Sequence, residues 1–439
     1  MSADGPATLT PTVPGVDGAY RLTRLPSGAR IITAPMRERA SVAVAVMFAV
    51  GSRYEDDRTA GLAHFIEHMV FKGSTRYPTA KAISEAVEGV GGVLNAATDK
   101  EATLFWAKVP AGKLPLAADV LCDMVYNAAL DSNELHKERQ VVIEELRMYV
   151  DNPQDYVHTL FDEVMWPDHP LGRDTAGTEA TVRSFERDDC LQYLREHYHG
   201  DNVVISVAGA IEHEAALDAL QPLVGAWGEG PSPAAPPAPA TTGGKERLRF
   251  LNKRTEQANI VLGTPGLSYL DEDRFVIDML NAVLGEGMSS RLFLSLREEQ
   301  ALAYDVHSFT IKHRDAGALG VYVGCEPKRA TKAAEAAIHE LTALAERRIG
   351  DAELTKAREY SKGRLMLQLE GTSSLCNYLG QQELLTGEIL LPDEVVRRID
   401  AVSADDIMRV ARTLREGGLR AAVIGPFRAP ERFESLLVA

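Results

Sequence analysis

The sequence predicts an α+β protein with two tandem homologous domains, each a mostly antiparallel sheet packed with helices. A chain of 439 residues is too long for one ordinary core and suggests two domains of about 200 residues. The stretch 228–246 is rich in Pro, Ala and Gly, which is typical of a linker because Pro breaks helices and strands. We therefore expect a flexible tail over 1–18, a first domain over 19–227 and a second domain over 247–439.

The two halves repeat one pattern of strands. Each begins with a strand-like run that leads through a polar turn into an apolar helix: Ser41–Phe48 in the first half and Asn259–Leu262 in the second. Alternation of apolar and polar residues then predicts two further strands within 92–109, and two more within 303–324.

Long amphipathic helices follow these strands in both halves. They are expected over Leu114–Asn127 and Ala330–Arg347. A second helical pair starts at Glu134 and at Glu353, and these two segments align without gaps at an offset of 219 residues. The repeat indicates internal duplication, in which one copy can keep the fold and lose a site.

Composition narrows the class of protein. Hydrophobic residues make up 45% and charged residues 25%, as in globular proteins. The net charge of −16 argues against nucleic-acid binding, because phosphates need a basic face, and suits neutral or basic partners. The four cysteines form no CxxC pair, which fits a reducing compartment. No apolar stretch reaches the roughly 18 residues that span a membrane, and no targeting segment precedes the first domain. We expect a cytoplasmic protein without membrane association.

A metal-binding pattern lies in an apolar helical run of the first half. His64 and His68 are four residues apart, so both imidazoles lie on one helix face and can reach one zinc ion. Glu67 faces the same region without being a ligand. This HxxEH order is the reverse of HExxH, the inverzincin motif. Zinc lowers the pKa of its water to about 7, and a neighbouring carboxylate then accepts the proton.

A catalytic zinc needs a third protein ligand, and the glutamates of the second long helix are the best candidates. Glu138 and Glu145 are two turns apart and share a face, whereas Glu144 points about 100° away. One carboxylate can bind the metal and the other can hold a histidine. The alternative is a pair of hydrogen-bonded core histidines, but the charge of Glu67 in an apolar run is costly without a partner and favours the metal site.

At this point the chain, from about residue 20 to 424, resembles the pitrilysin/insulinase family of metallopeptidases, in the branch that includes mitochondrial processing peptidase. In that family a glutamate ligand follows the second histidine by 77 residues, which selects Glu145. A further glutamate seven residues earlier helps to orient a histidine and corresponds to Glu138. The resemblance implies a zinc-dependent endopeptidase whose two domains form half of a clamshell chamber.

The resemblance also implies substrate-binding residues. An Arg and a Tyr seven residues apart hold substrate near the zinc in the family, and Arg297 and Tyr304 match them. Both are good donors to a carbonyl oxygen that gains negative charge. The alternative is a packed helix end with Arg297 in a surface salt bridge. Asn95 and Ala96 lie in a stretch that resembles the substrate-binding edge strand, although an ordinary exposed strand is the alternative.

The second half has no zinc site of its own. It contains no HxxEH, and at the offset of 219 the glutamates 138 and 145 correspond to Ala357 and Arg364. Since arginine cannot bind zinc, we expect one Zn²⁺ per chain.

Three classes of function remain at this stage. The favoured one is a homodimeric zinc endopeptidase that hydrolyses unstructured peptides or presequence-like segments. The others are a non-catalytic core-type structural subunit and a partner chain of a heterodimeric peptidase. Structural relatives have eroded metal motifs, and partner chains keep the Arg/Tyr pair but lack HxxEH. This chain carries both features, which favours a self-sufficient enzyme.

Overall fold

The computed structural model describes residues 20–225, 227–228, 230, 238–239 and 246–437. The expected tail over 1–18 lies outside these residues, as does most of the expected linker. The chain forms two compact units, and each consists of several separate segments. Unit 1 comprises Met1–Leu146, Asp174–Pro236 and Leu365–Val395; unit 2 comprises Arg147–Arg173, Pro237–Arg364 and Val396–Ala439.

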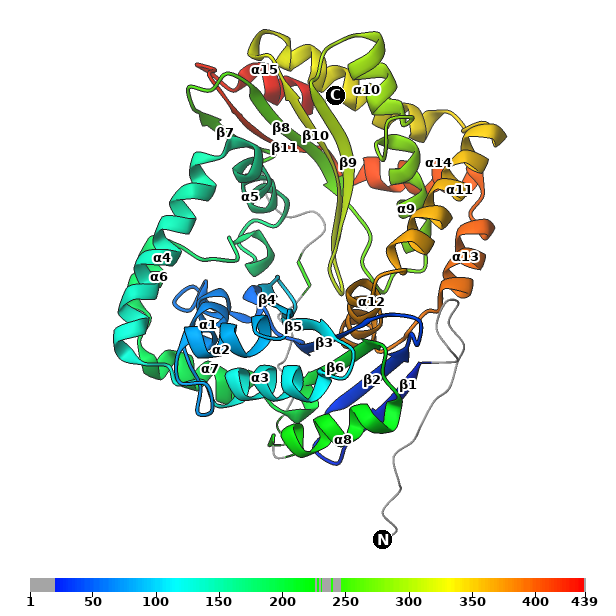
Figure 1. Ribbon diagram of the computed structural model, residues 1–439. Helices are drawn as coiled ribbons and strands as arrows, with labels where there is room; N and C mark the ends of the chain where they lie inside the picture. The colour runs from blue at the N-terminus through cyan, green and yellow to red at the C-terminus, as the bar shows by residue number, and fades with distance from the viewer. Residues whose placement is uncertain (1–19, 226, 229, 231–237, 240–245, 438–439) are drawn as a thin grey trace. The chain divides into compact units, whose positions relative to one another are not determined.

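Unit 1 is built on a six-stranded sheet in the order β1-β2-β6-β3-β5-β4 (Figure 1). Only β2 and β6 pair in parallel, and the other neighbours are antiparallel. The strands are β1 (Arg21–Arg24), β2 (Arg30–Pro35), β3 (Ser41–Phe48), β4 (Val93–Thr98), β5 (Thr103–Pro110) and β6 (Val203–Gly209). Strand β4 lies at one edge of this sheet, and it carries residues of the site described below.

Helices cover both faces of this sheet, which is why β3 is buried on both sides. Its residues at even numbers, such as Val44 and Val46, belong to the core cluster under α1, α3 and α8, and the odd ones, such as Ala45 and Met47, pack toward α12. A Cβ at Gly380 of α12 would lie 2.7 Å from the Met47 sulfur, so glycine permits this close approach. The helices are α1 (Leu62–Val70), α2 (Ala80–Glu88), α3 (Leu114–Tyr126), α6 (Glu179–Ser184), α7 (Arg187–His197), α8 (His213–Val224) and α12 (Thr372–Leu385).

Unit 2 repeats the plan with five strands in the order β7-β11-β8-β10-β9. Here β7 and β11 are parallel and the other pairs antiparallel. The strands are β7 (Leu248–Asn252), β8 (Ala258–Pro265), β9 (Asp305–Lys312), β10 (Gly317–Cys325) and β11 (Arg420–Gly425). The helices are α5 (Pro153–Met165), α9 (Arg274–Leu284), α10 (Ala330–Glu346), α14 (Ala404–Glu416) and α15 (Glu431–Glu434). Three further helices contain residues of both units: α4 (Ser132–Asp151), α11 (Asp351–Gln368) and α13 (Pro392–Ala401).

The duplication predicted from the repeat is visible in the topology. The order β7-β11-β8-β10-β9 matches β2-β6-β3-β5-β4. The only parallel pair of each sheet is the first pair of this shared order, β7 with β11 and β2 with β6. The strands expected within 92–109 and 303–324 are β4, β5, β9 and β10, and the expected long helices are α3, α4, α10 and α11. The two-domain α+β fold is thereby confirmed.

Each half of the sequence contributes one helix to the unit built mainly from the other half. The domain boundaries expected from the sequence did not include this exchange. Helix α5 follows α4 in the first half, yet it packs on β8 and β11 of unit 2, where Phe161 and Val157 join the core. Helix α12 follows α11 in the second half, and its Leu375 and Leu379 pack on the sheet of unit 1. The compact units are therefore not the contiguous domains 19–227 and 247–439.

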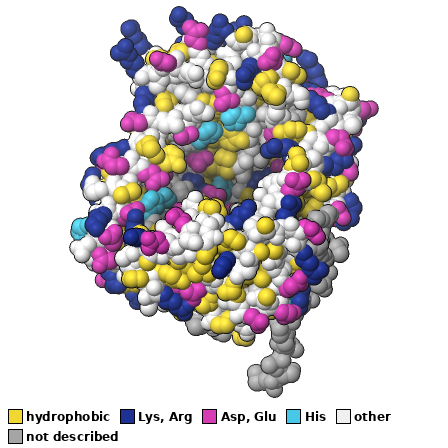
Figure 2. Space-filling model, viewed as in Figure 1, with side chains coloured by type: hydrophobic (Ala, Val, Ile, Leu, Met, Phe, Trp, Pro, Cys, Tyr) yellow, Lys and Arg dark blue, Asp and Glu magenta, His cyan; other side chains and the backbone are white. Residues whose placement is uncertain are grey.

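None of the described helices is both long enough and apolar enough to cross a lipid bilayer. Figure 2 shows acidic and basic side chains interspersed over the face that it presents.

Candidate metal centre

The helix that carries the two histidines starts at a capped and sterically fixed position. The Glu55 carboxylate accepts hydrogen bonds from the backbone N–H groups of Gly61 (2.7 Å) and Ala63 (2.6 Å), which satisfies donors that have no partner within α1. Gly61 has a φ of 96°, and a Cβ there would lie 2.4 Å from the carbonyl oxygen of Ala176. Glycine at this position thus sets the direction in which α1 begins.

Three predicted ligands converge within unit 1. The Nε2 atom of His68 lies 3.4 Å from Oε2 of Glu145, and Nε2 of His64 lies 3.8 Å from Oε1 of the same carboxylate. One ligand atom from each of the three residues lies within 4.8 Å of the others. Helix α1 supplies the histidines, and α4 supplies the glutamate. Their side chains are 14%, 21% and 27% exposed for His64, His68 and Glu145, so the group is open to solvent.

This donor set fits a zinc ion. Ligand atoms about 2.1 Å from a tetrahedral zinc lie about 3.4 Å from one another, close to the two separations measured here. Two imidazoles and one carboxylate are a common set of protein ligands for catalytic zinc and leave one coordination position open. Among the residues that the structure describes, this is the one group of three or more His, Cys, Asp or Glu side chains with such spacing.

Glu138 holds His68 from the side opposite Glu145. Its Oε1 lies 2.9 Å from Nδ1 of His68, and its Oε2 accepts a hydrogen bond of 2.6 Å from Nζ of Lys72. This arrangement directs Nε2 of His68 toward Glu145 and fixes the ring orientation, as carboxylates do for histidine ligands of metals. Burial alone would raise the pKa of Glu138, but the hydrogen bonds from His68 and Lys72 outweigh it and lower that pKa.

The two histidines differ in their electrostatics. Burial and the neighbouring His68 lower the pKa of His64 to about 4, so its ring is neutral at pH 7 and keeps a lone pair for a metal. Burial also opposes a charge on His68, but the hydrogen bonds to Glu138 and Glu145 raise its pKa to about 9. The carboxylates thus favour a positive charge at this position, which is where a cation would be held.

Glu67 lies beside this group but faces another partner. Its Oε2 accepts a hydrogen bond of 2.6 Å from the hydroxyl of Thr98, at the end of β4. Burial raises the pKa of Glu67, and the Thr98 hydrogen bond works against that rise. This hydrogen bond holds Oε2 of Glu67 in place. Because the two oxygens belong to one planar carboxylate, the bond also restricts the position of Oε1.

Arg297 and Tyr304 lie in unit 2 and contact each other. Arg297 is in a π-helical segment, Phe293–Glu299, and its guanidinium lies 5.7 Å from the centre of the Tyr304 ring. Ala301 between them has a φ of 49°, and the N–H of Tyr304 donates to the carbonyl of Gly324. Tyr304 is 73% exposed, and Arg297 is exposed as well. The Arg297 guanidinium also lies 4.9 Å from the centre of the Phe293 ring. The two groups are thus exposed donors joined by a cation–π contact.

Asn95 and Ala96 lie on β4, the edge strand of the unit 1 sheet. The strand pairs with β5 on one side. The N–H of Ala96 donates to the side-chain oxygen of Asn95 at 2.8 Å. An extended peptide that added to this edge would replace the Asn95 oxygen with its own carbonyl.

The sequence did not single out three residues that shape the centre: Glu55, Lys72 and Thr98. A signal existed for Lys72, because it lies four residues after His68, in the turn that directly follows α1. Thr98 is 31 residues from Glu67, and no local pattern links the two.

Comparisons with known proteins identify the family of this chain. Residues 30–179 match the family described as Insulinase (Peptidase family M16), and residues 184–360 match the Peptidase M16 inactive domain. An uncharacterized zinc protease of Streptomyces coelicolor is 37% identical over 94% of this chain and 90% of its own length. One from Bacillus subtilis is also 37% identical, over 91% of this chain and 97% of its own.

A solved structure has a similar fold. A protease from Helicobacter pylori superposes with a TM-score of 0.85 at 21% identity, over 96% of this chain and 100% of the other. The resemblance to the branch that contains mitochondrial processing peptidase stays a prediction. On the sequence matches, the chain belongs to the insulinase family of peptidases, M16.

Proposed function

We propose that this protein is a zinc-dependent endopeptidase that hydrolyses unstructured peptides or presequence-like segments. The observation that carries the proposal is the convergence of His64, His68 and Glu145 beside the Glu67 carboxylate. The names of the two similar zinc proteases support the choice of metal.

Each residue of the centre has a role in this proposal. His64, His68 and Glu145 hold one zinc ion per chain, and Glu138 orients His68. A zinc ion held by three protein groups supplies Lewis-acid activation of water. Glu67 accepts the proton of the attacking water and delivers it to the leaving amine.

Metal analysis tests the ligand assignment. Purified protein should contain about one zinc per chain. His68→Ala or Glu145→Ala should lower the occupancy strongly, because each removes one of three ligands. Glu144→Ala is the matched control, since the neighbouring glutamate of α4 is exposed and belongs to no such group. Measurement of bound zinc by atomic absorption checks this, and equal losses in the two glutamate variants would contradict the assignment.

Substrate binding at the β4 edge follows from the open position of that strand. An extended peptide can pair with the backbone of Asn95 and Ala96 through main-chain hydrogen bonds, whatever its sequence. A folded protein cannot offer such a segment without unfolding first. The net charge of −16 adds a preference for basic peptides.

Conformation of the substrate should therefore decide cleavage. A small disulfide-bonded protein should resist the enzyme in its native form and be cut after reduction and alkylation, because only the second form supplies extended segments. Mass spectrometry of the products gives both the rate and the cleavage sites. Equal rates on the two forms would rule out recognition by strand addition.

Arg297 and Tyr304 complete the proposed reaction as donors to the scissile carbonyl oxygen. Larger relatives implied by the family resemblance have four such domains in one chain, and the Arg/Tyr pair serves the zinc of the opposite half. This chain has two domains, so we propose a homodimer in which the pair of one chain serves the zinc of its partner.

We also propose a cytoplasmic location. All four cysteines, Cys122, Cys190, Cys325 and Cys376, are free and buried in the structure, which supports a reducing compartment.

A further inference from the structure

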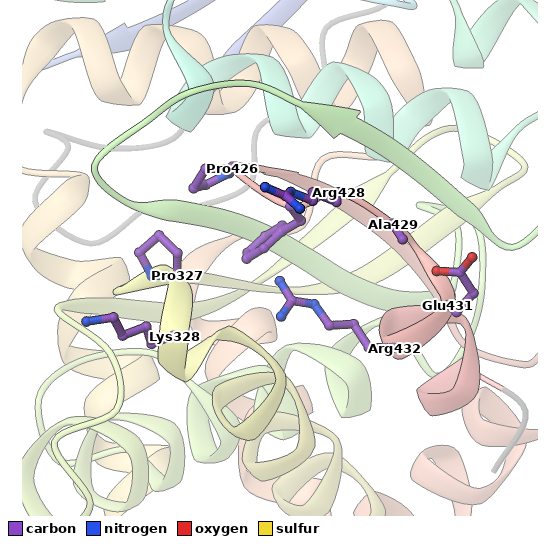
Figure 3. Close-up of a pocket in the computed structure, with 8 residues that line it drawn as sticks. Pro327, Lys328, Pro426, Arg428, Ala429, Glu431 and Arg432 are labelled. Atoms are coloured by element: carbon purple, nitrogen blue, oxygen red, sulfur yellow. The ribbon is translucent and has the colours of Figure 1, made fainter.

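A cavity lies in unit 2, beyond the C-terminal ends of β10 and β11. It has a volume of about 560 Å³ and is lined by the loop after β11, by the short helix α15 and by the turn at Pro327 and Lys328 (Figure 3). Pockets of about 300–1,000 Å³ are the usual size for small ligands. Most of the lining, from Pro426 to Arg432, lies beyond residues 30–179 and 184–360 that match the family.

One cation of this cavity, Arg432, contacts two aromatic rings, and its guanidinium N–H groups have no hydrogen-bond acceptor among the residues that the structure describes. The Arg432 guanidinium lies 4.0 Å from the centre of the Phe427 ring and 4.9 Å from that of Phe433. Both phenylalanines are buried, at 4% and 2% exposed, so they form a fixed support. These cation–π contacts hold the guanidinium at the cavity, and its five N–H donors can still bind a ligand there.

The charge of the cavity is opposite to that of the whole chain. Lys328, Arg428 and Arg432 line it together with one carboxylate, Glu431. Lys328 forms an ion pair of 3.7 Å with Glu326 beside the cavity. Among the described residues, neither arginine has a carboxylate within ion-pair distance. Elsewhere in unit 2, by contrast, Arg291 and Arg409 pair with Glu353 and Asp273. In a protein of net charge −16, two arginines without such partners in one cavity are a concentrated positive site.

We propose that this cavity binds a small molecule with two or more adjacent phosphate groups. Arginine forks match the geometry of phosphate oxygens, and lysine adds a point charge. A ligand with a single carboxylate would leave most of the volume unfilled and would serve only one of the two arginines that have no carboxylate partner. The proposal does not depend on peptidase activity.

Calorimetric titration of the full chain with sodium tripolyphosphate at low ionic strength tests the site. We expect one binding event per chain that weakens as salt is added. Arg428→Ala should weaken it about 10-fold, and the double variant Arg428→Ala/Arg432→Gln about 50-fold or more, because each loses charge-assisted hydrogen bonds. Arg428 is exposed, so its replacement leaves the fold intact, which thermal unfolding verifies.

Matched controls separate this site from others. Arg347→Ala removes the same charge at the far end of α10, about 25 Å along the helix from the turn at Lys328, and should change the affinity less than 2-fold. Because polyphosphates also bind zinc, His68→Ala should keep the wild-type affinity. Absence of binding, equal affinity in wild type and Arg428→Ala, or equally tight binding of citrate or adenosine would overturn the proposal.

Discussion

Glu67→Gln should lower kcat by at least ~100-fold, the usual contribution of a general base, while the zinc content stays at the wild-type level. Glutamine has the size of glutamate but cannot accept the proton from water. The Thr98 hydroxyl, 2.6 Å from Oε2 of Glu67, can still donate a hydrogen bond to the amide oxygen. The variant therefore keeps the local structure and separates chemistry from binding.

The measurement combines kcat and KM on an unstructured peptide with the zinc content of the same preparation. Glu144→Gln is the matched control, because it makes the same chemical change on α4 outside the centre. Thr98→Val should reduce kcat by about 10-fold at unchanged zinc content, since it removes the hydrogen bond that orients Glu67, and Thr98→Ser should restore it. Substantial turnover by pure Glu67→Gln protein would exclude Glu67 as the base.

Mixing of two inactive variants should restore activity if the sites are shared between chains. Glu67→Gln lacks the base, and Tyr304→Phe lacks a donor to the scissile carbonyl. A mixed dimer then holds one site with both changes and one intact site. At equal concentrations half of the dimers are mixed, so activity should rise to about a quarter of the wild-type value.

The reciprocal mixture is the control. When wild-type chains exchange with an excess of the double variant Glu67→Gln/Tyr304→Phe, every mixed dimer has one change in each of its sites. Activity should therefore fall well below that of the wild-type chains alone. If exchange is verified by a tag on one chain and neither effect appears, the pair serves the zinc of its own chain.

Local patterns in the sequence determined much of the fold and the candidate site. The strand-like apolar run Ser41–Phe48 predicted β3 with the observed bounds, and the HxxEH spacing placed His64 and His68 on one face of α1. These features depend on neighbours along the chain, whose geometry is set by the period of a strand or helix. The repeat at an offset of 219 likewise predicted two sheets of one topology.

The choice among the glutamates shows where local patterns stop. Helical spacing left Glu138 and Glu145 as equal candidates, and the family resemblance selected Glu145. In the structure Glu145 approaches both histidines, whereas Glu138 contacts Nδ1 of His68. This difference depends on how α4 crosses α1, and helical periodicity carries no information on that crossing.

Only the tertiary structure decided which segments complete each unit and each site. An amphipathic helix fits any apolar sheet face of suitable shape, so the pattern of α5 and α12 did not reveal that each packs with strands of the other half. The contacts of Thr98 with Glu67 and of Arg432 with Phe427 arise in the same way. A short sequence pattern fixes the face on which a side chain lies, but its partner is set by the packing of distant elements around a common core.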